Sequence, residues 1–254
     1  LWIGSAFAFG TVRRSVERAA DDSARRRTAL ATYPALLGWL RWGAALTWML
    51  GFVLLFLVYY RAPLLLDVAE LDPNELQRLL QPDGRPSPRA WIPGFLALIG
   101  SFPLYELCAR FLRGPRLWPL ALVLWSTIAV GTSCLLEHSA GFTQRAVFIH
   151  IATYLATAMA ANVWMRIWPA ERRALLAWSA GQPADAIDLA VSRERQRHNA
   201  AMAFSVVLLM LSTHHPALYS GTPWAWPWVA SVALALGLLL GELASRLSDR
   251  FSVE

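Results

Sequence analysis

Long apolar runs alternate with short polar segments along the whole chain. Six of these runs have roughly the 20 residues that an α-helix needs to cross a bilayer, and the first is shorter. They lie near residues 1–12, 36–59, 90–112, 117–136, 146–168, 200–218 and 226–247. The pattern predicts an all-α protein, a polytopic bundle of about seven transmembrane helices that forms one membrane domain over residues 1–254. Because residue 1 already lies within the first run, we expect that span to be truncated at its amino-terminal end.

The polar segments between the runs predict one exposed loop and a pair of short helices. Residues 60–89 show little helical periodicity apart from the stretch DPNELQRLL, in which Asp72 is a candidate N-cap and Pro73 the first helical residue. Residues 170–197 predict two amphipathic helices on the cytoplasmic surface, interrupted at 181–183.

The composition agrees with a membrane protein and narrows its partners. Hydrophobic residues make up 56% of the chain, which has 13 tryptophans and a mean hydropathy of +0.40. Trp224, Trp226 and Trp228 predict an aromatic belt at the membrane interface. The net charge of +6 comes entirely from arginines in the polar segments. This distribution favours the anionic head groups of a lipid bilayer as partners, and no motif for binding nucleic acid competes with it.

Arginine is distributed unequally between alternate polar segments. The segments around 13–41, 110–116, 166–197 and 246–250 hold 18 of the 23 arginines, and the intervening loops hold 5. Under the positive-inside rule, this asymmetry places the arginine-rich group in the cytoplasm. We therefore predict a multi-pass protein of the bacterial inner membrane with a periplasmic amino terminus and a cytoplasmic carboxyl terminus.

Three histidines near the predicted outer ends of neighbouring spans are the main candidates for chemistry. His150 lies in the run 146–168, and His214 and His215 lie at the end of the run 200–218. Imidazoles at matching depth predict an axial pair for haem b, with the haem iron held through His150 or His214. Arg145 could hold a haem propionate or an anionic substrate. The alternative is that these interfacial histidines only hydrogen-bond to backbone, water or lipid.

Covalent haem is excluded on the sequence. The two cysteines lie in different apolar runs, and the chain has no CxxCH motif. This chain therefore holds no covalent haem c.

Further polar residues lie within or beside the runs on the predicted cytoplasmic side. His198, with Asn199 beside it, is expected either to cap the run 200–218 or to bind a substrate. Asn162 is expected to hydrogen-bond across helices. Glu106 stands four residues before Arg110, a spacing that predicts an ion pair on one helix face, with a proton relay as the alternative.

Several separated motifs carry a resemblance to a known family. They are WIGSAF at 2–7, TWMLGF at 47–52, LVYY at 57–60, LYE at 104–106, RAVFIH at 145–150, ANVWMRIWP at 161–169, RQRHN at 195–199 and LSTHHP at 211–216. In this order they resemble the amino-terminal membrane domain of the PuuD-type urate hydroxylases, the cytochrome-c-linked bacterial urate oxidases. The resemblance covers nearly the whole chain.

The resemblance implies a function and a set of positions. Recurrent polar or breaker positions of the family pattern fall on His150, Asn162, His198, Asn199, His214 and Pro216, whereas His215 stands where an aromatic residue is expected. Family members typically continue into a periplasmic cytochrome c domain, so here we expect the electron acceptor to be a separate c-type cytochrome. The implied enzyme is a urate hydroxylase of purine catabolism.

Two functions from different classes remain open. The first is a membrane redox module, with or without haem, that passes electrons from urate or another small reductant to a c-type cytochrome. The second is a non-catalytic accessory subunit of a larger respiratory or photosynthetic membrane complex, which retains the fold without the activity.

Overall fold

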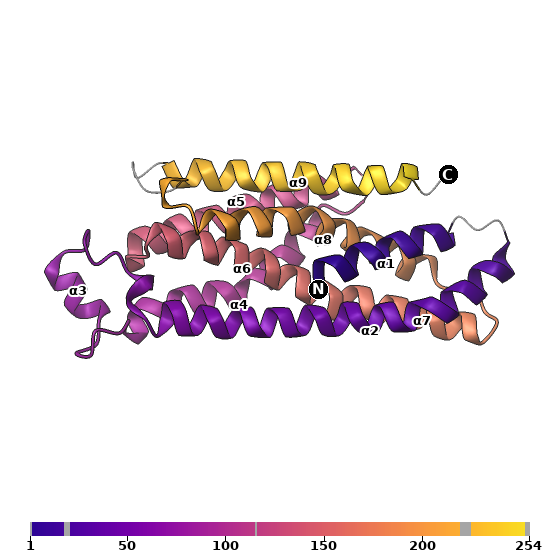
Figure 1. The fold of residues 1–254 in the computed structure, drawn as a ribbon, viewed down its shortest axis with the longest axis horizontal. Helices are drawn as coiled ribbons and strands as arrows, with labels where there is room; N and C mark the ends of the chain where they lie inside the picture. The colour runs from indigo at the N-terminus through magenta and orange to yellow at the C-terminus, as the bar shows by residue number, and fades with distance from the viewer. Residues whose placement is uncertain (1, 18–20, 115, 219–224, 252–254) are drawn as a thin grey trace. The chain divides into compact units, whose positions relative to one another are not determined.

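Nine α-helices make up most of the described chain, which comprises residues 2–17, 21–114, 116–218 and 225–251 of a computed structural model (Figure 1). The helices are α1 (Trp2–Glu17), α2 (Asp22–Leu55), α3 (Pro73–Leu79), α4 (Pro88–Phe111), α5 (Trp118–Ala140), α6 (Gln144–Asn162), α7 (Trp168–Ser179), α8 (Ala186–Ser212) and α9 (Ala225–Phe251). Two π-helical turns continue α2 and α6, at Phe56–Tyr60 and Val163–Ile167. Among the described residues only isolated β-bridges occur, so the predicted all-α class is confirmed.

Five helical stretches are long and apolar enough to cross a membrane. They are Ser23–Tyr60, Pro88–Phe111, Trp118–Ala140, Gln144–Ser179 and Ala225–Ala244. These stretches match the runs predicted near 36–59, 90–112, 117–136, 146–168 and 226–247. The runs near 1–12 and 200–218 lie in α1 and in the second half of α8, which are not among the five. A membrane protein is thus supported, whereas the count of seven spans is not confirmed.

The chain divides into two compact units where the sequence predicts one domain. Unit 1 comprises Leu1–Trp48, Met159–Phe204 and Leu238–Glu254, and unit 2 comprises Met49–Ala158 and Ser205–Gly237. The division falls within four helices, α2, α6, α8 and α9.

Unit 1 is held together by aromatic side chains and by close backbone contacts. The ring of Tyr33 meets those of Phe9 and Trp178 edge-on, at centroid separations of 5.4 and 6.2 Å. A side chain at Gly241 would run into the backbone of Ala201, so α8 and α9 approach each other through small residues here.

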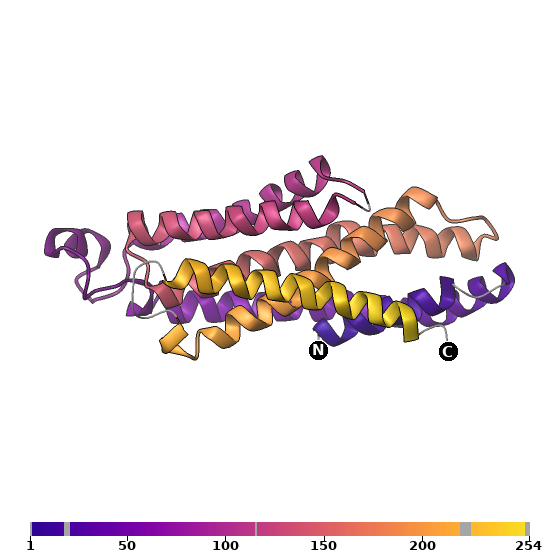
Figure 2. The ribbon, with the colours of Figure 1, turned by 90° about the horizontal axis from the view of Figure 1, so that it is seen from above.

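In unit 2, α4 and α5 form a helical hairpin, and the predicted exposed loop precedes it. Both views place α3 beyond the ends of the longer helices of this unit (Figures 1 and 2). The predicted cap is confirmed, since the Asp72 carboxylate accepts a hydrogen bond of 2.8 Å from the backbone N–H of Asn74, with Pro73 opening the helix.

The tryptophans near 226 do not form the simple belt that their spacing predicts. Trp226 is fully buried, and its Nε1–H donates to Glu137 Oε2 at 2.8 Å. Trp228 is 74% exposed, as an interfacial residue would be, and Trp224 lies outside the described residues. Trp226 therefore packs inside the protein, with its indole N–H bonded to the half-buried carboxylate of Glu137 on α5.

The expected helix start near His198 is also wrong. The amphipathic segment predicted after the break at 181–183 does not end before the next apolar run but continues into it as the single helix α8. Gly181, with φ of +74°, marks the break itself as predicted. His198 and Asn199 consequently lie in the interior of a helix and cap nothing.

Candidate functional site

His150 of α6 is enclosed in the core of unit 2. Its side chain is completely buried, and both ring nitrogens are hydrogen-bonded. Nδ1 lies 2.6 Å from the carbonyl oxygen of Ala146, and Nε2 lies 2.9 Å from the hydroxyl of Tyr60. Because a carbonyl can only accept, Nδ1 carries the proton, and Nε2 of the neutral ring accepts from the Tyr60 hydroxyl.

Aromatic rings pack around this histidine from several elements. Phe142 lies 5.1 Å from the imidazole between ring centroids, and Trp91 stacks on Tyr60 at 6.0 Å and 25°. The π-helical turn Phe56–Tyr60 sets the position of Tyr60, and such turns are frequent at functional sites. Gly94 permits the close packing, since a Cβ there would lie 2.8 Å from Phe142 Cζ and 3.2 Å from His150 Nε2.

These surroundings do not fit His150 as a ligand of haem iron. Iron would need the Nε2 atom that is bonded to the Tyr60 hydroxyl, and the imidazole is completely buried. His214 and His215 lie exposed in the turn that follows α8, so the three histidines do not share one buried site. Arg145 is half-buried in the first turn of α6. Within the described ranges, no three His, Cys, Asp or Glu side chains gather in a way that could hold a metal ion. Haem binding stays a prediction.

The expected ion pair on α4 is present. Arg110 Nε lies 2.8 Å from Glu106 Oε1, and the carboxylate side is largely buried while Arg110 is exposed. This arrangement accounts for an acid near the end of an apolar helix without a relay role.

Unit 1 brings together the polar residues that the sequence places toward the cytoplasm. Asn162 Nδ2 donates to Asn199 Oδ1 at 2.9 Å, and Asn199 Nδ2 donates to the carbonyl oxygen of Met159 at 3.0 Å. The predicted hydrogen bond of Asn162 across helices is confirmed. His198, one residue before Asn199, is also fully buried.

A buried ionic network in the same unit joins α1, α7 and α8. Arg13 is 2% exposed, and its Nη1 lies 2.7 Å from Glu171 Oε1 and 3.0 Å from Ser192 Oγ. Its Nη2 donates to the carbonyl oxygen of Leu189 at 3.0 Å. Ser192 donates in turn to Glu171, and Gln196 Nε2 donates to Ser192. The network fixes the guanidinium of Arg13 in one orientation, because several partners hold it at once.

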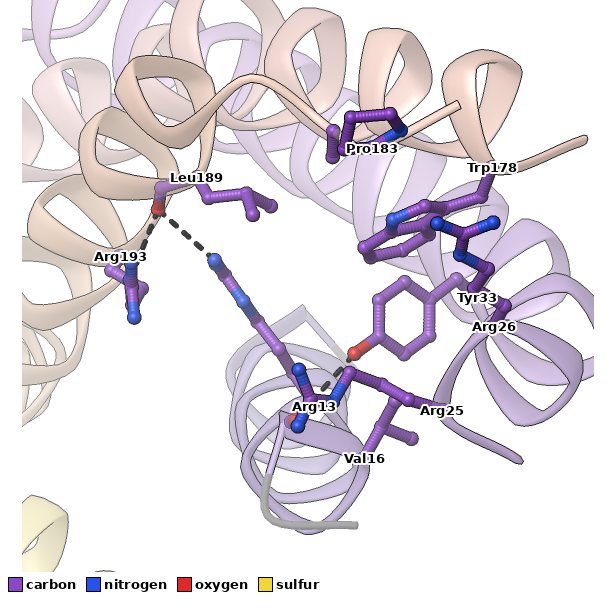
Figure 3. A pocket seen from close by; sticks show the side chains of 10 residues that line it. Arg13, Val16, Arg25, Arg26, Tyr33, Trp178, Pro183, Leu189 and Arg193 are labelled. Atoms are coloured by element: carbon purple, nitrogen blue, oxygen red, sulfur yellow. Dashed lines mark hydrogen bonds between the residues drawn. The ribbon is translucent and has the colours of Figure 1, made fainter. Parts of the chain in front are cut away.

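A pocket of about 380 Å³ lies beside this network. The described residues that line it are Arg13, Val16, Arg25, Arg26, Tyr33, Trp178, Pro183, Ala184, Leu189 and Arg193. Figure 3 shows Leu189 and the Arg13 side chain across an open space from the rings of Trp178 and Tyr33. Among the described residues that line the pocket, four are cationic and none is acidic. Such a wall suits an anion with an apolar or aromatic body.

The turn between α7 and α8 is closed by a second, exposed ion pair. Arg173 binds both carboxylate oxygens of Asp188, at 2.7 and 2.5 Å. The hydrogen bonds from Arg173 hold the pKa of Asp188 below its ordinary value. This clamp fixes the loop that supplies Pro183 and Ala184 to the pocket.

Two kinds of site residue escape prediction from the sequence. Tyr60 lies within the motif LVYY, but its partner His150 is 90 residues away, and hydrogen-bond pairing leaves no local signal. In the sequence, Arg13 is one of the arginines that mark the predicted cytoplasmic side. Nothing there indicates that its buried ion-pair partner is Glu171, 158 residues further on. The single available signal is the position of Arg13 directly after an apolar run.

Comparison with known proteins gives a family and no individual relative. The model of the family described as "Urate oxidase N-terminal" matches residues 22–241. No curated protein and no solved structure matches the chain. The match covers most of the chain and both units, including His150, Asn162, His198 and Asn199. The chain belongs to the urate oxidase N-terminal family.

Proposed function

We propose that this chain is the membrane module of a urate-oxidising system, which takes electrons from urate and passes them to a c-type cytochrome. The observation that carries the proposal is the family match over residues 22–241. The five membrane-length helices support a site within or beside a bilayer. We also propose the bacterial inner membrane, with the amino terminus periplasmic, from the distribution of the arginines.

The proposed reaction balances with water as the oxygen source. A hydroxylation that adds one oxygen atom from water to urate releases two protons and two electrons. The electrons reduce two ferricytochromes c, each by one electron, and the protons leave to solvent. The chain's own part is to bind and orient the anionic substrate and to keep nearby groups in a defined protonation state.

A direct test adds a c-type cytochrome as the electron acceptor. Membranes that carry the chain would be mixed with a purified c-type ferricytochrome, and cytochrome reduction would be followed with and without urate. Urate-dependent reduction that is absent from membranes lacking the chain is the expected result. A difference spectrum of reduced minus oxidised purified protein, measured alongside, tests for haem b independently.

The second candidate is a non-catalytic accessory subunit of a larger membrane complex. The observation that favours it is the hydrogen bonding of His150. Both imidazole nitrogens have protein partners and the ring is completely buried, so this histidine is not available to a cofactor. Under this reading no cytochrome is reduced by urate, and redox subunits co-purify with the chain in stoichiometric amounts. The two measurements therefore separate the two functions.

A further inference from the structure

The pocket in unit 1 joins two arginine-rich segments that lie far apart in the sequence. Arg13, Arg25 and Arg26 come from α1 and the start of α2, and Arg193 comes from α8. The positive-inside rule explains why these segments are basic, but it requires only that the arginines remain on the cytoplasmic side. It does not explain why Arg13 is 2% exposed and contributes to the wall of a cavity.

Hydrogen bonds within unit 1 hold three of the cationic side chains that line this pocket. Arg13 is held by Glu171, Ser192 and the Leu189 carbonyl. Arg26 Nη1 donates to the carbonyl oxygen of Gly181 at 3.0 Å, and Arg193 Nε donates to that of Leu189 at 3.3 Å. A binding site whose cations are fixed in advance loses little conformational entropy when an anion enters.

The charge of the wall selects an anion. Glu171 lies behind Arg13 and offsets its charge, while Arg25, Arg26 and Arg193 add three more cations. Guanidinium groups are planar and present paired N–H donors, which suit flat oxyanions and the carbonyl edges of heterocycles.

The other side of the pocket is lined by two aromatic residues, Tyr33 and Trp178, which are packed edge to face. Tyr33 is buried, and the half-buried Trp178 offers the aromatic surface. The Tyr33 hydroxyl lies 3.4 Å from the carbonyl oxygen of Arg13, which ties the aromatic side to the cationic side. A cavity of about 380 Å³ is near the lower end of the range for small-molecule sites, which matches a bicyclic heterocycle.

We propose that this pocket binds a planar heteroaromatic anion of purine size, and specifically the urate anion. The inference rests on the proposed function for the identity of the ligand, and on the pocket itself for its chemical class. The guanidinium groups bind the carbonyl and deprotonated edges of the heterocycle, and the ring of Trp178 contacts its face. Arg13 lies in the wall of the site with its guanidinium held in place by Glu171, Ser192 and the Leu189 carbonyl.

Equilibrium binding of radiolabelled urate to the detergent-purified chain tests the proposal. Arg193→Gln removes one cation from the pocket. Arg197→Gln is the matched control, because Arg197 is exposed one turn further along α8 and does not line the pocket. Loss of a charge-assisted hydrogen bond is expected to weaken urate binding about tenfold or more in Arg193→Gln and to leave Arg197→Gln unchanged. Equal affinities for the two variants, or no binding by the unchanged chain, would overturn the proposal.

Competition separates urate from other anions. Inorganic phosphate and micelles containing phosphatidylglycerol would be added to the urate-loaded protein in separate experiments. Retention of urate in both is the expected result. Displacement by either one at comparable concentration would show a general phosphate site and would overturn the assignment to a planar heterocycle.

Turnover distinguishes failure of the pocket from failure of the proposed function. If urate reduces the cytochrome and Arg193→Gln leaves KM unchanged, the pocket assignment is wrong and the redox function stands. If the chain binds urate in an Arg193-dependent way but reduces no cytochrome, the pocket assignment stands and the redox function falls.

Discussion

The two units use buried polar groups in different ways. In unit 2, His150 is neutral, both of its nitrogens are satisfied, and aromatic rings close around it. Unit 1 also buries the neutral pair Asn162–Asn199, but it adds an ionic network of Arg13 and Glu171 that borders a pocket. A neutral pair in a closed core stabilises a packing arrangement, whereas a fixed cation beside a cavity is prepared to bind something. We therefore expect a ligand to bind in unit 1, although the sequence predicts a site at the histidines.

We expect the largest loss of stability from a variant that breaks the ionic network of unit 1. Glu171→Gln leaves the Arg13 charge buried without its counter-ion, so we expect the free energy of unfolding to fall by about 3–5 kcal/mol. Thermal denaturation in detergent measures this. The double variant Arg13→Met with Glu171→Leu should recover most of the loss, because it removes both charges. A melting temperature of Glu171→Gln equal to that of the unchanged chain would contradict the network.

The next change removes the neutral hydrogen bond of unit 2. Tyr60→Phe takes the hydroxyl away from His150 Nε2 and leaves that nitrogen buried without it, at an expected cost of about 1–3 kcal/mol. Tyr154→Phe is the matched control, because the Tyr154 ring also contacts His150, while the two imidazole nitrogens are bonded to Tyr60 and to the Ala146 carbonyl. Chemical denaturation should separate the two variants. Equal losses would mean that the pair with His150 contributes nothing specific.

Two separate glycine-to-alanine variants on α4 test the close packing around His150. Gly94→Ala places a Cβ against Phe142 and His150, and overpacking of this kind costs about 1–3 kcal/mol. Gly100→Ala on the same helix meets nothing within 4 Å and should be neutral or slightly stabilising, since alanine is the better helix former. Melting temperatures of the two variants give the comparison. A loss of the same size in both would point to helix α4 as a whole and away from the histidine core.

The smallest effect concerns the exposed ion pair of unit 1 and depends on pH. The lowered pKa of Asp188 contributes stability that is present above its unfolded pKa and is lost as pH falls through its folded pKa. Because Arg173 is 60% exposed, the contribution should not exceed about 1 kcal/mol. Asp188→Asn should therefore lower the melting temperature slightly at neutral pH and not at acid pH below the folded pKa. An unchanged difference across that range would exclude the carboxylate as its cause.

Several features of this protein follow from the sequence because they depend on local pattern. Runs of apolar residues predict the five membrane-length helices, since an α-helix satisfies its own backbone hydrogen bonds in lipid. The Asp72 cap and the Glu106–Arg110 pair also follow, because each involves residues within one or two helical turns. The break at Gly181 is local in the same sense.

Tertiary structure decided the rest, because it depends on which distant segments meet. The polarity of SRERQRHN predicts the end of a short amphipathic surface helix, yet packing within unit 1 buries Ser192, Arg195, His198 and Asn199 on one continuous helix. Periodicity cannot show that Tyr60 would satisfy His150 or that Glu171 would neutralise Arg13, since each pair is closed by folding across a long sequence separation. The sequence by itself determined a helical membrane protein with basic segments. Only the fold determined that two of those segments form a single pocket, because a cavity is a property of juxtaposed surfaces and not of any one stretch of chain.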